Sequence, residues 1–386
     1  MKRVYCEPVL ETKLHRPMNT VPAVPDHRKP AAYSGDAFAY SLPGGFIKAT
    51  PGARPEHVDA QTPEAGVERD RERTLIVTDV ACDLPADWLA RERAVMLPMK
   101  LRFDSRMRTD AGVAESARAF FNHDLADISS NAQALPLSAS GAYDFIFDHL
   151  PTRADFVLHL SLASSRGHGY MNSLTAAQNL MLQHGRTRRQ AGVTRPFKMW
   201  VIDSTTALNG HGLLVGESVR VLNEGMSVPR VVQHIDALRK QVHTLAVPPD
   251  VSFFYRHNRI EGDAAIPWLS YGVGKMLDRT PILHGQRGSL SVAAQARGAE
   301  AAIVRALNAV TQKVADKADG LLAPFVCVSY AGDIAQLSNL AAFAALASAC
   351  SEHQATLLVA TMSMTNALVV GAGGLAISLA CESLLI

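Results

Sequence analysis

The chain has 386 residues, of which 48% are hydrophobic and 19% are charged, and its formal net charge is +2. This length exceeds the roughly 250–300 residues at which a single core stops growing, so we expect two domains. The near-neutral charge and the lack of a long basic run argue against nucleic acid as the main partner, and the composition is typical of a globular protein.

The cysteine pattern and the absence of targeting signals predict a cytoplasmic protein. The five cysteines are scattered and form no CxxC pair, which is typical of a reduced compartment. The opening MKRVYCEPVLETKLHRP lacks the apolar core of a signal peptide. Residues 355–386 carry Glu382 as their sole charge, but polar residues and glycines interrupt them, so we expect two buried elements there and no stable membrane span.

Residues 1–70 contain nine of the twenty prolines and show no sustained periodicity, which predicts a poorly ordered extension. From Thr74 onward, apolar runs and amphipathic segments alternate. This rhythm predicts an N-terminal domain at 74–245 with a parallel, Rossmann-like sheet and helices on both faces. The expected strands are 74–78, 95–103, 156–162 and 198–203, and the expected helices are 115–125, 141–150, 170–184 and 212–224.

The pattern changes after Gln241, and residues 246–386 are expected to form a C-terminal α/β domain with a mixed sheet. Residues 247–263 are rich in loop signals, and a hairpin is expected around Gly285 and Gly288. Further helices are expected at 266–277, 296–316 and 333–351, and strands at 325–330 and 355–361.

Three familiar motifs are absent or incomplete. The loop at 163–169, ASSRGHG, lacks the glycines of a G-x-S-x-G nucleophile elbow. The stretch around Lys275 lacks the first glycine and the final hydroxyl of a P-loop. GAGGLA at 371–376 fits G-x-G-x-x-A, but too few residues follow it for a dinucleotide-binding unit.

The loop at 163–169 joins an expected strand to an expected helix, a position that favours anions. Helix N-termini expose unpaired N–H groups and carry a partial positive charge. Ser164 and Ser165 would add hydroxyl donors, and Arg166 or His168 would add charge. The alternative is that Ser164 or Ser165 simply caps the helix.

Other polar residues have a structural and a functional interpretation. His168 and His211 each lie in a Gly-His-Gly triplet at a strand-to-helix turn, whereas His243 is among the histidines expected on solvent-facing helices. No His or Cys spacing supports a metal site. Asp79 and Asp83 could act as acid/base groups or metal ligands, but we favour caps of the first helix.

A series of segments in the expected order resembles the DegV family of bacterial fatty-acid-binding proteins. The resemblance spans about residues 74–380. The segments that carry it are TLIVTDVACDLP at 74–85, MLPMKLRF with Thr109-Asp110, VLHLSLASSRGHGYMNSLTAAQ, WVIDSTTALNGHGLLV at 200–215, Arg259-Ile260 and TPILHGQRGSL.

The resemblance implies two α/β domains with a lipid between them. The carboxylate of a bound fatty acid would lie near the domain junction, and its acyl chain would run into an apolar tunnel. In some members the protein presents the fatty acid to a separate kinase subunit, which phosphorylates the carboxylate with ATP. The expected ligand is therefore a fatty acid, with no other cofactor, and a fatty-acid kinase subunit is a possible partner.

Only one of three family positions that hold the carboxylate matches cleanly, and that residue is Ser164. The family's Thr-Ser motif falls near Leu135-Pro136, where Ser138 or Ser140 would have to supply the hydroxyl. The family's histidine falls on Val369. Because a cation is lost there, we expect Arg166 or His168 to anchor the head group, with His211 as a further candidate.

The apolar residues expected to line the tail pocket are Leu358, Leu368, Val369 and Val370. The leading expectation is a non-catalytic carrier of a fatty acid or similar amphiphile. One alternative is an enzyme that acts on a small anionic substrate with Asp79 and His168 as acid and base. The other is a regulatory or interaction module that has lost its lipid.

Overall fold

The computed structural model describes residues 70–103, 105–125, 128, 132–151, 154–257, 279–316 and 320–386. These residues lie within one compact unit, His57–Ile386. Apart from Asp70, the expected extension lies outside the described residues, as do Arg259 and the helix expected at 266–277.

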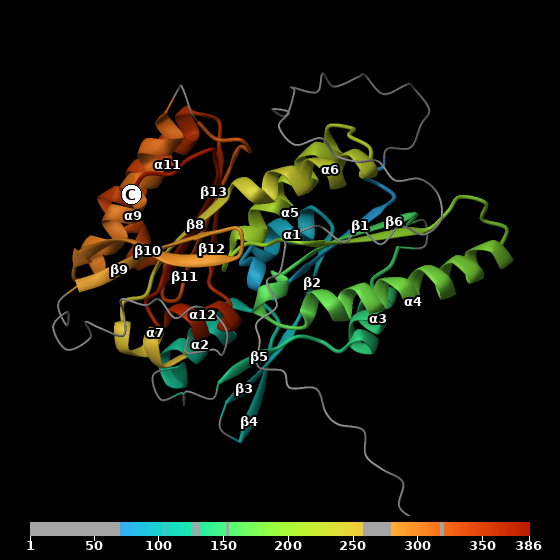
Figure 1. Cartoon of the computed structure of the whole chain (residues 1–386), viewed down its shortest axis with the longest axis horizontal. Helices are drawn as coiled ribbons and strands as arrows, with labels where there is room; N and C mark the ends of the chain where they lie inside the picture. Colours follow the sequence, from blue (N-terminus) through green and yellow to red (C-terminus); the bar gives the residue numbers. More distant parts are fainter. Residues whose placement is uncertain are drawn as a thin grey trace, which may run out of the picture. The chain divides into compact units, whose positions relative to one another are not determined.

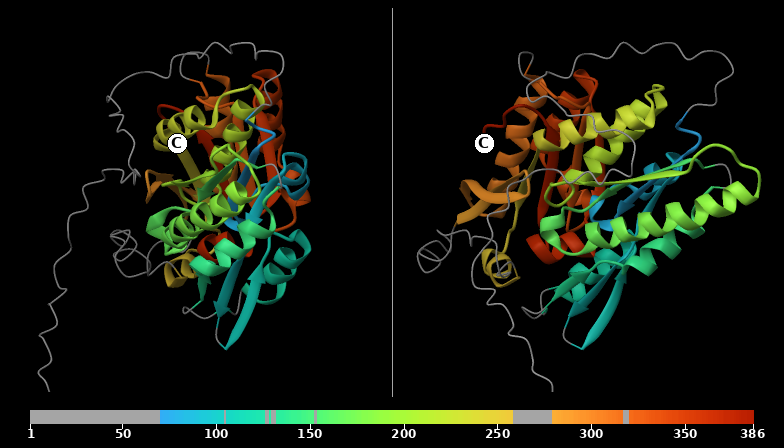
Figure 2. Two further views of the ribbon diagram at one scale, coloured as in Figure 1. Left: turned by 90° about the vertical axis from the view of Figure 1, so that its right-hand side faces the viewer. Right: turned by 45° about the vertical axis from the view of Figure 1, so that its right-hand side comes forward.

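The N-terminal sheet is four-stranded and parallel, with the order β2-β1-β6-β7. Buried side chains alternate between its two faces, as they do for Val77 on one face and Ile76 on the other. One face is covered by α3 and α4, which lie side by side, and the other by α1 and α5 (Figures 1 and 2). The bounds are β1 Thr74–Asp79, β2 Ala94–Leu97, β6 Phe156–Ser161, β7 Lys198–Asp203, α1 Ala86–Arg91, α3 Ala139–Asp148, α4 Gly169–Gln190 and α5 Gly210–Asn223.

A small antiparallel sheet with the order β4-β3-β5 follows, and it corrects the single strand expected at 95–103. Pro98 divides that segment into β2 and β3, which belong to different sheets. Proline has no N–H to continue a ladder, so the chain changes partners there. The bounds are β3 Met99–Phe103, β4 Arg106–Asp110 and β5 Gln133–Leu135, and helix α2 Ala114–His123 lies between β4 and β5 in the chain.

The C-terminal sheet is six-stranded and mixed, with the order β10-β9-β8-β13-β11-β12. β11 and β12 are parallel, and the other neighbours are antiparallel. Its strands are β8 Val242–Val247, β9 Arg279–Gln286, β10 Ser289–Arg297, β11 Phe325–Tyr330, β12 Thr356–Thr361 and β13 Leu375–Ala380. All of β8 pairs within this sheet, so the expected domain boundary between residues 245 and 246 falls inside a strand. The C-terminal sheet begins at Val242.

Helices α9 Ala299–Ala315 and α11 Ala341–Glu352 pack on one face of the C-terminal sheet. The helix expected at 333–351 is divided into α10 Ile334–Ser338 and α11. The stretch expected to be loop-rich contains α7 Val251–His257, and the apolar segment before Gly371 forms α12 Met364–Val370. Other short elements are α6 Val228–Leu238 and the 3-10 turns Val80–Cys82, Ser164–Arg166 and Arg239–Gln241.

His243 corrects a further expectation, because it lies in β8 and not on a solvent-facing helix. Its side chain is buried, and its Nδ1 lies 2.8 Å from Nε2 of His284 on β9. Burial, together with the neighbouring His284 ring, lowers the pKa of His243 to about 4. The expected hairpin is confirmed, with its turn at Arg287-Gly288, and Gly285 lies within β9.

Helix α5 lies between the two large sheets and packs against both. It contacts β1 and β6 on one side and β8, β11 and β13 on the other (Figure 1). Three glycines allow this close approach: a Cβ at Gly212 would lie 2.3 Å from the Cys82 carbonyl oxygen, one at Gly210 would lie 2.9 Å from Thr244 Oγ1 on β8, and one at Gly216 would lie 3.2 Å from the Phe325 ring. The core is therefore continuous from one sheet to the other.

In the described part of the chain, no helix combines the length and the apolar character that crossing a bilayer requires.

We expect Gly212→Ala to lower the free energy of unfolding by about 1–3 kcal/mol or more, because its methyl group would overlap a backbone oxygen that cannot rotate away. Denaturant unfolding followed by circular dichroism measures this change. Gly185→Ala in α4 is the matched control, since its Cβ would meet the end of the Arg189 side chain at 3.7 Å. That variant should be neutral or more stable by up to about 1 kcal/mol; equal effects at both positions would contradict the close packing of α5.

Candidate functional site

The strand order of the N-terminal sheet places a topological switch point between β1 and β6. The chain leaves β1 for β2 on one side and returns to β6 on the other. In open α/β sheets, ligands bind at the carboxyl ends of the strands at such a point. Asp79 ends β1, and the loop with Ser164 and Ser165 follows β6, so the structure places both segments at this edge.

Ser164 lies in the expected loop, but both of its hydrogen-bond donors, the hydroxyl and the backbone N–H, already donate to a carboxylate of the same chain. Its hydroxyl donates to Asp203 Oδ2 at 2.5 Å, and its backbone N–H donates to Asp203 Oδ1 at 3.1 Å. Asp203 ends β7, and Thr205 N–H donates to the same carboxylate at 3.0 Å. Ser164 would therefore have to exchange Asp203 for a ligand before it could donate its hydroxyl to an anion.

The other residues expected at the head group occupy different surroundings. Ser165 and His168 are exposed, and Arg166 is half-buried. His168 is the N-cap residue of α4, a 22-residue helix whose first turn contains no acidic residue. Ser138 caps α3 by accepting a hydrogen bond from Gly141 N–H at 3.2 Å, which is a structural role in the present arrangement.

His211 is fully buried at the start of α5, away from the exposed part of the loop. Its Nδ1 lies 3.2 Å from the Leu208 carbonyl oxygen and its Nε2 lies 3.4 Å from that of Asp79. Burial lowers the pKa of His211, which favours a neutral ring. The structure therefore does not bring His211 together with Ser165 and His168 as a charged group.

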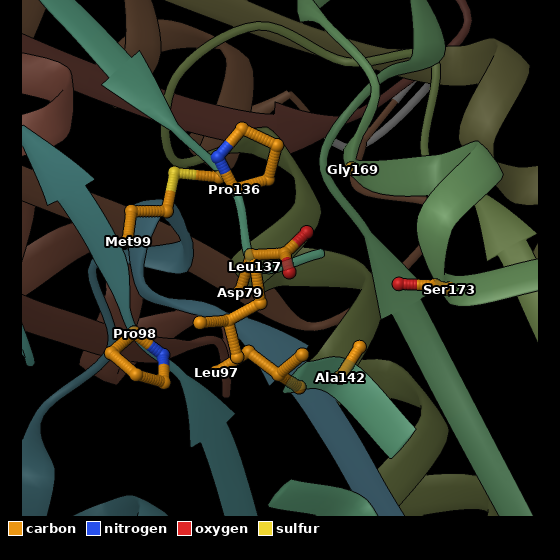
Figure 3. Close-up of a pocket in the computed structure, with 9 residues that line it drawn as sticks. All are labelled: Asp79, Leu97, Pro98, Met99, Pro136, Leu137, Ala142, Gly169 and Ser173. Carbon is orange, nitrogen blue, oxygen red and sulfur yellow. The ribbon is translucent and has the colours of Figure 1, made fainter. Parts of the chain in front are cut away.

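A pocket opens between the ends of β1 and β2 and the N-terminus of α4 (Figure 3). The space of about 220 Å³ measured there includes open solvent, and its enclosed part has room for about one water molecule. The Ser173 hydroxyl points from α4 toward the side where the Asp79 carboxylate lies (Figure 3). The residues that line the pocket are Asp79, Leu97, Pro98, Met99, Pro136, Leu137, Ala142, Gly169 and Ser173.

Beside the pocket lies a buried His–Asp pair whose histidine the sequence analysis missed. His159 on β6 is fully buried, with its Nε2 3.6 Å from Asp79 Oδ1. Among the described residues, neither nitrogen of the His159 ring has a hydrogen-bond partner. Asp79 accepts a hydrogen bond from Leu162 N–H at 2.5 Å. Burial would raise the pKa of Asp79, but the His159 and His211 rings and this N–H outweigh it, so its pKa lies below the ordinary value.

Strand β3 links this pocket to a large apolar cluster. Met99 lines the pocket, and Leu101 and Phe103 belong to the cluster, on the same face of the strand. The four steps from Met99 to Phe103 cover about 13 Å. The cluster also includes residues of α2, α7 and α12, which lie side by side in Figures 1 and 2.

The structure brings together three of the four residues expected at the tail pocket. Leu368 and Val370 belong to the cluster beside β3, and Val369 packs against it. Leu358 lies elsewhere, in the core around α5, because β12 directs it to the same face as Phe325 and Cys327 of β11. Leu358 and Leu368 are otherwise similar, with 6% and 7% of their surfaces exposed.

Two buried carboxylates from the N-terminal half hold the first turn of α12. Asp83 accepts hydrogen bonds from Ser363 N–H and Asn366 Nδ2, each at 2.8 Å. Asp110 accepts from the N–H and the hydroxyl of Thr365, also at 2.8 Å. Burial raises the pKa of Asp83 to about 6 and also raises that of Asp110.

These bonds correct the interpretation of Asp79 and Asp83 as caps of the first helix. Within the described part of the chain, the Asp79 side chain forms no cap of the turn that follows β1. Asp83 instead binds α12, which is distant in the sequence. Helix α12, which carries Leu368 and Val370, is thereby fixed to the N-terminal half of the chain.

Among the described residues, no group of three or more His, Cys, Asp or Glu side chains is arranged to hold a metal ion.

Known proteins match this chain over nearly all of its described length. The family model described as "Uncharacterised protein, DegV family" matches residues 73–382. A DegV domain-containing protein of Xanthomonas axonopodis pv. citri is 30% identical over 310 residues, which cover 80% of this chain and 98% of the relative.

Solved structures share the fold. A DegV lipid binding protein of Thermotoga maritima has a TM-score of 0.61 at 16% identity, and the match covers 81% of this chain and 99% of that one. The Streptococcus pneumoniae fatty acid kinase B3 protein, solved loaded with linoleic acid, has a TM-score of 0.58 at 14% identity, with 80% and 99% covered. The family model spans most of the sequence and the α/β fold agrees with it, so this chain belongs to the DegV family.

Proposed function

We propose that this protein binds a single fatty acid, or a similar anionic amphiphile, without catalysing a reaction of its own. The head group would lie at the switch point between β1 and β6, near the start of α4. The acyl chain would follow the inner face of β3 into the cluster formed with α2, α7 and α12.

The observation that carries this proposal is the unbroken apolar row from Met99 to Phe103. It connects a pocket with polar groups at its floor to a mainly apolar cluster, and an amphiphile requires one polar end and one apolar end. The pocket alone is too small for a long acyl chain. The acyl chain of the ligand would therefore have to displace side chains of the cluster, which contains adaptable residues such as Met362 and Met364.

A role in delivery rather than catalysis is supported by one of the structural neighbours. The Streptococcus pneumoniae protein is named a fatty acid kinase B3 protein and was solved loaded with linoleic acid. We propose that the present chain delivers its ligand to a separate kinase subunit. The Ser165 and His168 side chains at the head-group end are exposed, which would leave this end accessible to such a partner.

Organic extraction of the purified protein, followed by mass spectrometry, tests the proposal directly. We expect about one fatty acid per chain. An unrelated protein purified in parallel from the same host controls for carry-over of free lipid. A chain that carries no lipid and does not take up added fatty acid would contradict the proposal, and turnover of a small polar acid by that chain would favour the enzyme alternative.

Leu368→Ala and Leu358→Ala form a matched pair that tests the path of the tail. Both should lower the free energy of unfolding by about 2–5 kcal/mol, because both remove a buried leucine. Only Leu368→Ala should weaken fatty-acid binding, by about tenfold, since it removes contacts worth roughly 0.8 kcal/mol per methylene group. Titration of a fluorescent fatty acid measures both affinities. Equal losses of affinity, or a loss confined to Leu358→Ala, would place the tail elsewhere.

Arg166 and His168 remain the proposed cationic anchors at the rim, because the family's histidine is replaced by Val369. Arg166→Ala or His168→Ala should weaken binding by about tenfold or more, which is the effect of one lost hydrogen bond to a charged group. Arg186→Ala, on the exposed surface of α4, is the control and should leave the affinity unchanged. Unchanged binding in both rim variants would remove these residues from the site.

A further inference from the structure

The floor of the pocket carries a negative charge where the proposed function places an anionic head group. Asp79 lines the pocket and its residue is 5% exposed. Its Oδ2 is fixed by Leu162 N–H at 2.5 Å, and its Oδ1 faces His159 at 3.6 Å. Two carboxylates that share one buried site cannot both remain ionised without a large cost, and the usual result is that they hold a proton between them.

His159 makes this floor unusual, because its side chain is fully buried and its ring nitrogens lack hydrogen-bond partners within the described residues. A buried polar group without a partner costs on the order of 1–3 kcal/mol. Such groups are rare in native proteins and call for a specific explanation, of which an absent ligand or proton is one. The 3.6 Å separation from Asp79 becomes an ion pair if the ring is protonated.

The residues around His159 and Asp79 bear on why a histidine is buried at this position. On the same face of the sheet, β1 and β6 otherwise contribute Leu75, Val77 and Val157 to an apolar core with α3 and α4. His159 pairs with Val77 of this core, and the buried polar residues Asp79 and Ser161 follow on the same face at the carboxyl ends of the two strands. The Nε2 atom of His159 faces Asp79 Oδ1, and protonation of the ring would make this contact an ion pair.

We propose that this protein takes up one proton when it binds a fatty-acid carboxylate, and that the proton is held among the ligand carboxyl group, Asp79 and His159. This inference rests on the proposed function. The ligand arrives as the anion, one proton comes from solvent, and the bound complex carries one negative charge fewer than its separated parts.

Other titratable groups around Asp79 are His211 on α5 and Cys82 and Asp83 after β1. Asp203 and Arg166 belong to the neighbouring strand-end loops.

The competing explanation is that Ser164 and the cationic side chain of Arg166 hold the head group at the rim alone, so that it never reaches Asp79. There the carboxylate would pair with the Arg166 guanidinium, which is charged at neutral pH, so binding would need no added proton. Proton uptake through His168 at the rim would be lost in His168→Ala and kept in Asp79→Asn, the reverse of what the floor position predicts. The two positions therefore predict different proton counts for the same ligand.

Calorimetric titration of the delipidated full-length protein with linoleate distinguishes these two positions of the head group. At pH 7, in buffers with different ionisation enthalpies, the observed enthalpy should vary with a slope of about one proton taken up per ligand. Between pH 7 and 9, the affinity should fall by about tenfold for each unit of pH, which is the linkage expected for one proton. The pH series uses the unaltered chain, so it does not depend on whether any variant folds.

Asp79→Asn should reduce the uptake toward zero and flatten the pH dependence, because the second carboxylate is gone. Asp144→Asn, on the exposed side of α3, removes the same charge at a distance and should retain the uptake. Linoleate binding with no proton uptake in the unaltered chain would overturn this inference and leave the proposed function intact. Failure of linoleate to bind at any pH would instead overturn the proposed function.

Discussion

The rest of the structure depends on the burial of one helix, α5, between two sheets. Nearly every residue of α5 is buried, and its glycines bring its backbone close to the Cys82 carbonyl on one side and to Phe325 on the other. The helix thus contributes to a core that includes β1 and β6 of the parallel sheet and β11 of the mixed sheet. A side chain at Gly212 would push the turn after β1 away, and that turn carries Asp79 and Asp83.

The candidate site follows from this arrangement, because the turn after β1 serves two purposes. Asp79 points into the pocket beside α4, while Asp83 binds the first turn of α12. Asp83 adopts a left-handed backbone conformation with φ of 48°, which turns the chain sharply between the two carboxylates. One short segment therefore connects the polar floor of the pocket to the helix that carries the expected tail residues Leu368 and Val370.

Much of the fold could be predicted from the sequence, because the period of apolar residues is a local signal. The strands beginning at Thr74, Phe156 and Lys198 were expected within a residue or two of where they lie. The division at Pro98 was missed because an apolar run on both sides of a proline looks like one strand. Val251–His257 was missed as a helix because the two prolines before it dominate the pattern.

The site was harder to predict, because it depends on contacts between distant segments. Ser164 was found in the expected loop, but its bond to Asp203 could not be foreseen from spacing. Leu358 and Leu368 both lie in apolar runs of the sequence, but Leu358 lies in β12 and packs in the core around α5, whereas Leu368 lies in α12 and packs in the cluster beside β3. His159 did leave a signal, since a histidine in the middle of the apolar run FVLHLSL is unusual, but its importance depends on Asp79, which lies on another strand.

The sharing of α5 also constrains how any ligand would reach the interior. Separating the two sheets would expose this helix and the leucines of its core, which costs about 25 cal/mol for each Å² of apolar surface. Displacing α12 alone would break the hydrogen bonds to Asp83 and Asp110 and uncover a much smaller area, since α12 spans Met364–Val370. Exchange of a buried ligand would thus be a local opening, with its rate set by the release of the short helix α12, while both sheets stay in place.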